Sequence, residues 1–208
     1  MKIKDGTVTM ADLTAAGAPQ LGLVPNDLIN HGCAITGNDC TNVFAVSIES
    51  IEGVKPAAYI TWFQAAAAAR NAGKRLPTNA EWQAAALGTP DDGAFCNTTG
   101  GLAMNTGSHS QCVSDVGAFD MVGNLWEWVA DWVPLTTKCA GELFSGTGDY
   151  NCLAGDPGPL SGGTAALLRG GGFSPSQGSG PGVFAVTAFV SPSTDPSSFG
   201  HIGFRAAR

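Results

Sequence analysis

Two predicted helices, joined by a short polar connection, constrain the fold of this chain more than any other feature of its sequence. The first lies in YITWFQAAAAARNAGKRLP, where Trp62 and four alanines recur every three or four residues and Gly73 suits the end of a helix. The second has Thr78 as its N-cap, Glu81 completing a capping box and Gly88 as its stop. Short apolar runs and irregular loops make up the rest, so the sequence predicts an α+β fold.

Strand-like alternation is confined to short segments. Predicted strands lie in residues 43–50 (VFAVSIES), 182–186 (GVFAV) and the closing HIGFRAAR. In GNLWEW, a strand would place Trp126 and Trp128 on one side and Glu127 on the other. The chain has no repeat and no interdomain linker. We therefore predict one domain over residues 46–208, with residues 1–45 packed on it or extending it.

Composition and charge restrict the possible partners. Charged residues make up only 13% of the 208 residues and the net charge is -7. An acidic surface repels phosphate, so nucleic-acid binding is disfavoured. No apolar run reaches the roughly 18–20 residues that a membrane helix needs, and MKIKDGTVTMADL lacks the apolar core of a signal peptide. We expect no membrane insertion and a virion-associated protein, or one that is cytoplasmic before release.

The six cysteines fall into three near pairs without a Cys-x-x-Cys motif, so zinc-ribbon and thioredoxin sites are disfavoured. Disulfides between neighbours and free thiols both remain open. Disulfides would indicate a protein that works outside a reducing cytosol, or one from a thermophile. The near pairs are Cys33/Cys40, Cys96/Cys112 and Cys139/Cys152.

Four ordered blocks carry a resemblance to a known family. They are AGKRLPTNAEW (72–82), GAFDMVGNLWEW (117–128), LRGGGF (168–173) and IGFRAAR (202–208). Together they resemble the formylglycine-generating (sulfatase-modifying) enzymes, which implies a variant of the C-type lectin fold with two helices, short antiparallel strands and long loops. Arg169 and Arg205 lie in these blocks beside apolar strand residues, and we expect them to bind buried carboxylates or carbonyls.

The oxidase chemistry of the resembled enzymes requires a cysteine pair shortly after the Arg-Gly-Gly turn, where the thiolates bind copper. This chain has no cysteine from Leu153 to Arg208, and serine, proline and glycine cannot replace thiolates for copper(I). Other branches of the family use a histidine-rich iron site, whereas His31, His109 and His201 are spread over three regions. We therefore expect no enzyme activity and no required cofactor.

The same closing blocks resemble the variable proteins of diversity-generating retroelements, in which a reverse transcriptase rewrites adenines near the end of the gene. The resemblance implies a variable region over residues 170–201, with framework words separated by changeable ones. Trp, Lys and Glu, which rewritten asparagine codons cannot encode, are absent from residues 170–202. The predicted contact residues are Ser174, Pro175, Ser176, Thr187, Phe189, Val190, Ser198, Phe199, Gly200 and His201.

The resemblance also implies a structural calcium ion around VGNLWEW. Its ligands would come from Val122, Gly123, Leu125 and Glu127, whose backbone and carboxylate oxygens suit a hard cation. The alternative is that Glu127, between two tryptophans, forms hydrogen bonds within the protein.

The sequence thus predicts a ligand-binding protein that displays a variable C-terminal surface to a protein or cell-surface target, as on a phage. We expect the contact residues to be exposed and to converge on one face, as adaptable side chains do on a rigid scaffold. The alternative is an enzyme or enzyme-derived domain of the formylglycine-generating family with lost or altered chemistry.

Overall fold

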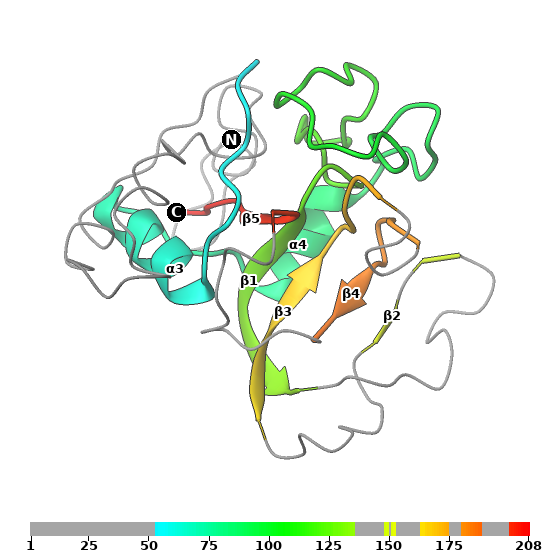
Figure 1. Ribbon diagram of the computed structural model, residues 1–208. Helices are drawn as coiled ribbons and strands as arrows, with labels where there is room; N and C mark the ends of the chain where they lie inside the picture. The colour runs from blue at the N-terminus through cyan, green and yellow to red at the C-terminus, as the bar shows by residue number, and fades with distance from the viewer. Residues whose placement is uncertain (1–52, 136–147, 150, 153–162, 175–179, 189–199) are drawn as a thin grey trace.

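The computed structural model describes residues 53–135, 148–149, 151–152, 163–174, 180–188 and 200–208 (Figure 1). The predicted N-terminal segment 1–45 and the predicted strand 43–50 lie outside the described residues. Within the described part, two helices accompany one mixed sheet, which confirms the predicted α+β class.

The sheet has the strand order β2-β4-β3-β1-β5. The long strand β1 pairs antiparallel with β3 and parallel with β5, while β4 pairs antiparallel with β3 and parallel with β2. The last strand of the chain, β5, therefore lies beside β1, and β1 and β3 separate it from β4, the strand that precedes it in the sequence. The bounds are β1 Trp126–Pro134, β2 Asn151–Cys152, β3 Thr164–Arg169, β4 Val186–Thr187 and β5 Ile202–Phe204.

Helix α3 (Trp62–Asn71) forms as the alanine spacing predicts. Thr61 caps it, and the Gln64 side-chain oxygen accepts a hydrogen bond from the Thr61 N–H at 2.9 Å. Gly73 follows the helix with φ +69°, and its N–H donates to the Arg70 carbonyl at 2.9 Å. This left-handed residue satisfies carbonyls that the helix end leaves without partners, so the predicted stop is confirmed.

Helix α4 (Asn79–Ala86) begins with the predicted capping box. The Thr78 side chain accepts from the Glu81 backbone, and Glu81 accepts from the Thr78 N–H at 2.8 Å. Arg75 reinforces this start, because its guanidinium donates to both carboxylate oxygens of Glu81 at 2.6 and 2.7 Å. Gly88 has φ +79° just beyond the end of the helix, in agreement with its predicted role.

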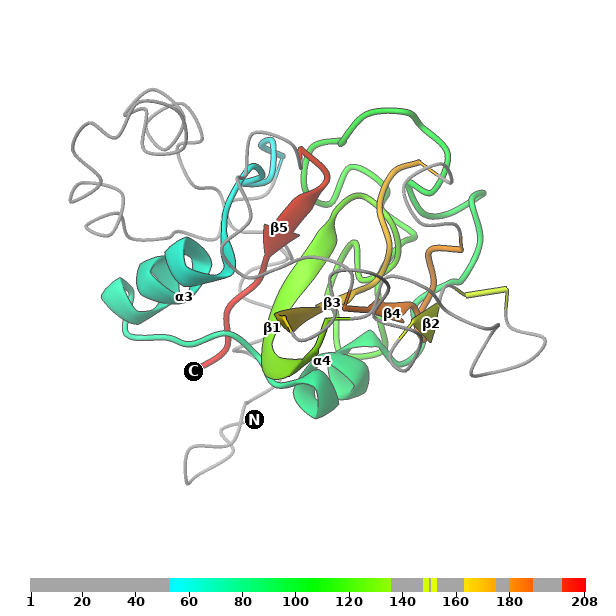
Figure 2. The ribbon, with the colours of Figure 1, turned by 60° about the horizontal axis from the view of Figure 1, so that its bottom comes forward.

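The helices pack on opposite faces of the sheet (Figures 1 and 2). Alternate residues of β3 belong to different buried clusters: Leu168 packs with α3, whereas Leu167 packs with α4. In β1, Trp126 and Trp128 join the α3 cluster, while Glu127 accepts a hydrogen bond from Trp82 of α4. The predicted opposite orientation of Glu127 and the two tryptophans is therefore confirmed, since strand side chains alternate.

The C-terminal strand is shorter than the predicted closing run, ending at Phe204. Beyond it, Ala207 forms an isolated antiparallel bridge with Arg75, with two backbone hydrogen bonds of 2.8 Å. The connection between the helices is thereby fixed to the C-terminus.

The predicted strand over residues 182–186 is wrong. Residues 182–185 form a turn, in which the Ala185 N–H donates to the Gly182 carbonyl at 3.0 Å, and strand pairing is limited to Val186 and Thr187. Long-range contacts override the local alternation, because the Gly182 N–H donates to the Gly170 carbonyl and the Phe184 N–H to the Asp149 carboxylate.

Neither of the described helices has the length and apolar character needed to cross a bilayer.

Candidate ligand-binding surface

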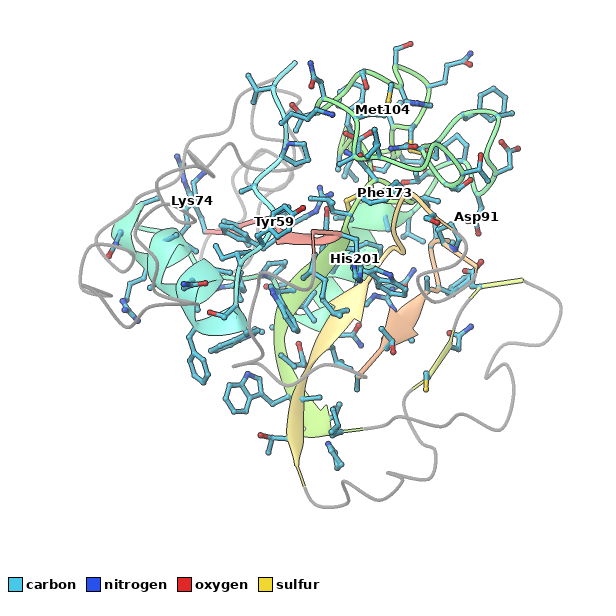
Figure 3. The ribbon with its side chains drawn as sticks, in the orientation of Figure 1. Tyr59, Lys74, Asp91, Met104, Phe173 and His201 are labelled. Carbon is cyan, nitrogen blue, oxygen red and sulfur yellow. A yellow bond between two sulfur atoms is a disulfide. The ribbon has the colours of Figure 1, made fainter. Side chains whose placement is uncertain are left out.

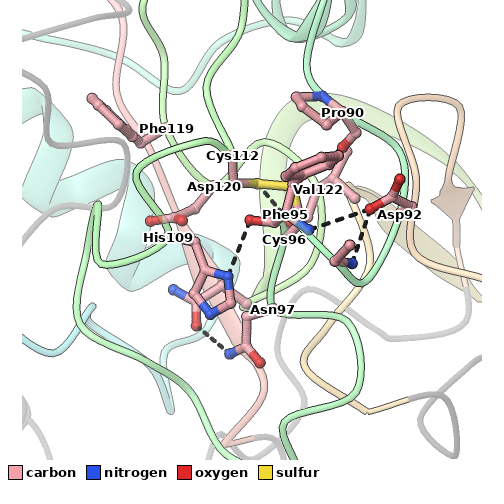
Figure 4. The surroundings of a disulfide bond; sticks show 12 residues. Pro90, Asp92, Phe95, Cys96, Asn97, His109, Cys112, Phe119, Asp120 and Val122 are labelled. Carbon is pink, nitrogen blue, oxygen red and sulfur yellow. Dashed lines mark hydrogen bonds between the residues drawn. A yellow bond between two sulfur atoms is a disulfide. The ribbon is translucent and has the colours of Figure 1, made fainter.

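The loop before β1 is held by a disulfide and by buried polar contacts. Cys96 and Cys112 are bonded to each other, which confirms one of the predicted near pairs (Figure 4). Cys152 is also disulfide-bonded, to a partner outside the described residues. Beside the first disulfide, the His109 ring contacts the Phe95 carbonyl at 3.0 Å and Asp92 accepts from the Phe95 N–H at 3.2 Å (Figure 4). Cross-links and short polar contacts thus order a loop with no regular secondary structure.

A tight turn at Gly123 and Asn124 brings three segments together. Both residues have positive φ, and a Cβ on Gly123 would lie 2.4 Å from the Asn97 carbonyl oxygen. The Asn124 side chain accepts from the Met104 N–H at 2.8 Å, and its backbone carbonyl accepts from the Phe173 N–H at 3.1 Å. Met104 and Phe173, far apart in the sequence, therefore both contact this turn.

The Arg-Gly-Gly turn allows close backbone contact, as predicted. Gly170 and Gly171 have φ values of +86° and +83°, and a Cβ on Gly171 would lie 2.3 Å from Cα of Pro181. A side chain at this position would clash with Pro181, so the glycine lets the backbones of residues 171 and 181 lie side by side.

The end of the predicted variable region lies beside the start of β1. Trp126 donates its backbone N–H to the His201 carbonyl at 2.8 Å. A Cβ on Gly172 would lie 3.9 Å from Cβ of His201, so the segments entering and leaving the variable region are adjacent. Tyr59 completes the group, because its ring lies over Gly200.

These contacts define one continuous group, which we call the candidate surface (Figure 3). Tyr59 and Met104 are each 40% exposed, and Phe173, Ser174 and Gly200 are partly exposed. Exposed apolar side chains gathered on a folded scaffold are typical of binding surfaces. The candidate surface consists of Tyr59, Met104, Phe173, Ser174, Gly200 and His201.

The predicted contact residues differ in their placement. Gly200 and His201 lie next to Gly172, two residues before the partly exposed Ser174. Exposure is wrongly predicted at Thr187, which is fully buried because β4 lies between β2 and β3. It is also wrongly predicted at His201, which is 8% exposed and packs at the start of β5. Outside the described residues lie Pro175, Ser176, Phe189, Val190, Ser198 and Phe199.

Burial sets the electrostatics of this group. It lowers the pKa of His201, so the imidazole is neutral at pH 7. Beneath the loop, burial raises the pKa of Asp120 to about 6, although this carboxylate accepts a 2.8 Å hydrogen bond from the Gly107 N–H. The candidate surface therefore presents aromatic, thioether and hydroxyl groups.

Glu127 is bound within the protein. It accepts from the Trp82 indole N–H at 2.7 Å and forms a buried ion pair with Arg205, which donates to both carboxylate oxygens. These contacts do not fit a calcium ligand, because the carboxylate is already neutralised by a guanidinium. The ion expected at Val122, Gly123, Leu125 and Glu127 stays a prediction, which a melting temperature in excess chelator would test. This ion pair confirms the expectation that Arg205 binds a buried carboxylate.

Arg169 is buried without a direct carboxylate contact among its described hydrogen bonds. Its guanidinium donates to the Val183 carbonyl at 3.0 Å and to the Gln83 side chain, and it lies 4.5 Å from the ring centroid of Trp82. Burial lowers the pKa of Arg169 to about 10, while Asp149 opposes this shift. The expectation that Arg169 binds a carbonyl is confirmed.

Two carboxylates hold the turn at residues 182–184. Asp149 accepts from the Phe184 N–H at 2.7 Å, and Asp91 accepts from Val183 and forms a side-chain hydrogen bond with Asp149. Burial first, and Asp149 second, raise the pKa of Asp91 to about 6. Charged groups thus fix the backbone in the middle of the predicted variable region.

The described residues offer few groups for redox or metal chemistry. Cys96, Cys112 and Cys152 are all disulfide-bonded. In the ranges described above, no three His, Cys, Asp or Glu side chains lie close enough to hold a metal ion. The site's described chemistry is therefore that of hydrogen bonding and apolar contact.

The family described as sulfatase-modifying factor enzyme 1-like domain matches residues 26–208. The chain belongs to this family. Formylglycine-generating enzyme of Streptomyces coelicolor is 33% identical over 176 residues, which cover 73% of this chain and 52% of that protein. Hercynine oxygenase of Mycolicibacterium smegmatis is 33% identical over 134 residues, which cover 52% of this chain and 31% of that protein. The chain spans about half the length, or less, of these curated relatives.

A solved structure shares the fold. The Major Tropism Determinant M1 variant superposes with a TM-score of 0.50 and 25% identity, over 70% of this chain and 36% of that one. Treponema denticola variable protein 1 superposes with a TM-score of 0.48 and 20% identity, over 75% of this chain and 72% of that one. The family match and the M1 variant confirm the resemblance inferred from the four sequence blocks, including the C-type-lectin-like fold.

Sequence reasoning missed Tyr59, Met104 and Phe173 as members of the candidate surface. Phe173 ends the block LRGGGF, so its contact with the Asn124 turn could have been anticipated, whereas Met104 lies in the irregular run before the second block. Tyr59 has no such signal, because its position over Gly200 depends on contacts between segments about 140 residues apart.

Proposed function

We propose that this protein binds a protein ligand through a C-terminal surface whose residues are varied by a diversity-generating retroelement. One observation supports the proposal: Gly172 and Gly200–His201, near the two ends of the predicted variable region, are adjacent, and exposed Tyr59 lies over Gly200. The likeness to the Major Tropism Determinant M1 variant supports it, since that protein is named as a determinant of tropism.

The buried framework supports the same role. Arg205 and Glu127 form a buried ion pair, and the Gly170–Gly171 turn fixes the backbone where the predicted variable region begins. A rigid scaffold of this kind lets side chains change identity without changing the fold.

A library provides the direct test. Residues 174–176, 198 and 199 would be randomised, and the displayed chains selected against a purified protein such as hen lysozyme. We expect binders with Kd values below about 1 μM, equivalent to about 8 kcal/mol, and melting temperatures close to that of the parent. A control library at exposed helix positions Arg70, Ala84 and Leu87 should yield none.

Two results would contradict the proposal. One is a failure of the first library to yield more binders than the control library. The other is flanking DNA that has neither a reverse-transcriptase gene nor a near-copy of codons 170–208 differing mainly at adenines.

A second function is favoured by the 33% identity to formylglycine-generating enzyme, which points to an enzyme of this family. Against it, the sequence from Leu153 to Arg208 has no cysteine to bind copper. Incubation with copper(I) and a cysteine-containing sulfatase peptide tests this alternative. We expect no formylglycine by mass spectrometry, with the Streptomyces enzyme as positive control.

A further inference from the structure

Tyr59 has an unusual backbone conformation for an aromatic residue. Its φ is +56°, in the left-handed region that side chains with a Cβ rarely adopt. The conformation is imposed by neighbouring contacts: the Ile60 carbonyl accepts from the Trp128 indole N–H at 3.0 Å, and the Ala57 carbonyl oxygen lies 2.5 Å from where a Cβ on Gly203 would be. A strained conformation persists only when its surroundings determine it, and such residues concentrate at functional sites.

The Tyr59 side chain is exposed on an otherwise buried segment. Ala57, Ala58 and Ile60 are 2%, 8% and 3% exposed, whereas Tyr59 is 40% exposed. The left-handed backbone therefore directs one large amphipathic side chain out of a segment that is otherwise part of the core. A tyrosine presented in this way offers apolar area and a hydroxyl with only two side-chain torsions to order on binding.

Gly200 lies directly under this ring. A Cβ at Gly200 would lie 2.5 Å from both Cζ and the hydroxyl oxygen of Tyr59, and 2.9 Å from Cε1. All three of the nearest atoms belong to the tyrosine, and Gly200 is not one of the glycines with positive φ. The φ at residue 200 therefore does not exclude a residue with a Cβ, and the Tyr59 ring is the group that such a Cβ would meet first.

We propose that Tyr59 is a constant ligand-contact residue of the candidate surface, and that residue 200 selects the position of its ring. The inference rests on the proposed function, since residue 200 belongs to the predicted variable region and the ligand is a protein. Glycine at residue 200 lets the ring lie down over the backbone. Any larger residue displaces the ring, so one changed codon alters two contacts with the ligand: its own side chain and Tyr59.

The first experiment needs no ligand. Tyr59 and Tyr150 are the two tyrosines of the chain, so nitration by tetranitromethane followed by peptide mapping reports on each. In Gly200→Ala, we expect the nitration rate of Tyr59 relative to Tyr150 to change at least threefold. The matched control is Gly172→Ala, where the nearest atom to the new Cβ would be Cδ1 of Trp126 at 3.4 Å and no atom of Tyr59 is near. An unchanged Tyr59 rate in Gly200→Ala would overturn the proposal.

A double variant tests the role of the Tyr59 ring even if Gly200→Ala by itself does not fold. If the ring is what excludes a side chain, then adding Gly200→Ala to Tyr59→Ala should leave the melting temperature of Tyr59→Ala unchanged. Equal destabilisation in both backgrounds would place the conflict elsewhere and overturn the role of Tyr59.

The second experiment uses binders selected against hen lysozyme from the library described above. Tyr59→Ala should weaken most independent binders at least tenfold in Kd, and Tyr59→Phe should weaken them less. Phe63→Ala is the control, because Phe63 is 42% exposed but its ring lies 5.6 Å from that of Trp132, towards the opposite end of β1. Affinities unchanged by Tyr59→Ala would overturn this inference and leave the proposed function standing. A library without binders would remove the proposed function, and with it the ligand-contact role of Tyr59.

Discussion

Arg205 and Arg169 are both buried beside Trp82, yet their partners differ. Arg205 forms an ion pair with Glu127, whose carboxylate also accepts from the Trp82 indole N–H. Arg169 lies against the ring of the same tryptophan and donates to neutral acceptors, the Val183 carbonyl and the Gln83 side chain. Trp82 therefore contacts both the carboxylate that pairs with Arg205 and the guanidinium of Arg169, but only Arg205 donates to a charged acceptor.

The difference follows the position of the two arginines in the chain. Arg205 joins β1 to the C-terminal segment, both of which belong to the framework. Arg169 joins the framework to the turn at residues 182–184, inside the predicted variable region. The ion pair thus lies between framework segments, whereas the turn at residues 182–184 is held through its backbone, by Arg169 at the Val183 carbonyl and by the carboxylates of Asp91 and Asp149 at backbone N–H groups.

Breaking the charged contact should have the largest effect. Arg205→Met leaves the Glu127 carboxylate buried without its counter-charge, and we expect the free energy of unfolding to fall by about 3–5 kcal/mol. Urea denaturation measures this change. The double variant Glu127→Leu/Arg205→Met should recover part of the loss, because no unpaired charge remains. A loss below about 1 kcal/mol in Arg205→Met would show that the ion pair does not hold the framework.

Removing the hydrogen bonds from Arg169 to its neutral acceptors should lower the free energy of unfolding by less. Arg169→Met removes the donor to the Val183 carbonyl and the Gln83 side chain, and the expected loss is about 2 kcal/mol, because neutral acceptors are cheaper to leave unpaired than a charge. Hydrogen exchange at Val183 and Phe184 should accelerate as well. Arg75→Met is the control, since the Arg75–Glu81 pair is partly exposed and worth about 0–1 kcal/mol. Equal losses in Arg169→Met and Arg205→Met would contradict the comparison.

Gln83→Glu would give Arg169 a carboxylate partner, as Arg205 already has. The new carboxylate would accept from Arg169, and it would replace a buried Gln83 Nε2 that has no hydrogen-bond partner among the described residues. We expect a gain of about 1 kcal/mol at pH 7, lost as pH falls through the lowered pKa of the new glutamate. Denaturation at pH 7 and pH 3 measures it, with Gln83→Met as the control. Destabilisation at pH 7 would mean that the site accepts only neutral partners.

The smallest effect should come from the carboxylates that hold the variable turn. Because the pKa of Asp91 is raised to about 6 in the folded protein, its protonated form favours folding, and this contribution is lost as pH rises through 6. Asp91→Asn removes that dependence. The stability of the variant relative to wild type should therefore rise between pH 4 and pH 8, by about 1 kcal/mol at most, because the residue is exposed enough for solvent screening.

Thermal unfolding as a function of pH measures this effect. Asp115→Asn, which changes an exposed carboxylate that is not among the groups shifting the pKa of Asp91, controls for the loss of one negative charge. A difference between Asp91→Asn and wild type that stays constant with pH would place the titrating group elsewhere.

Local chemistry explains which parts of the fold could be predicted from sequence. Thr78 and Glu81 cap α4 through atoms three residues apart, and Gly73 ends α3 through its own backbone conformation. The alternation of Trp126, Glu127 and Trp128 depends only on strand geometry. Each of these features depends on contacts within a few residues.

The wrong predictions concern residues whose conformation or burial is set by segments distant in the sequence. The run at 182–186 alternates like a strand, but Asp149 and Gly170 accept its backbone N–H groups and hold a turn. Thr187 was expected on the surface, but the sheet places it between two other strands. Neither Asp149 nor the strand order is visible in the local pattern.

The sequence by itself determined the two capped helices, the glycine turns, the α+β class and the framework blocks, because those follow from local backbone preferences and alternation. Only the tertiary structure decided that Glu127 pairs with Arg205 and that Tyr59 lies over Gly200. The physical reason is that these contacts join segments separated by about 80 to 140 residues, whose meeting depends on how the whole core packs.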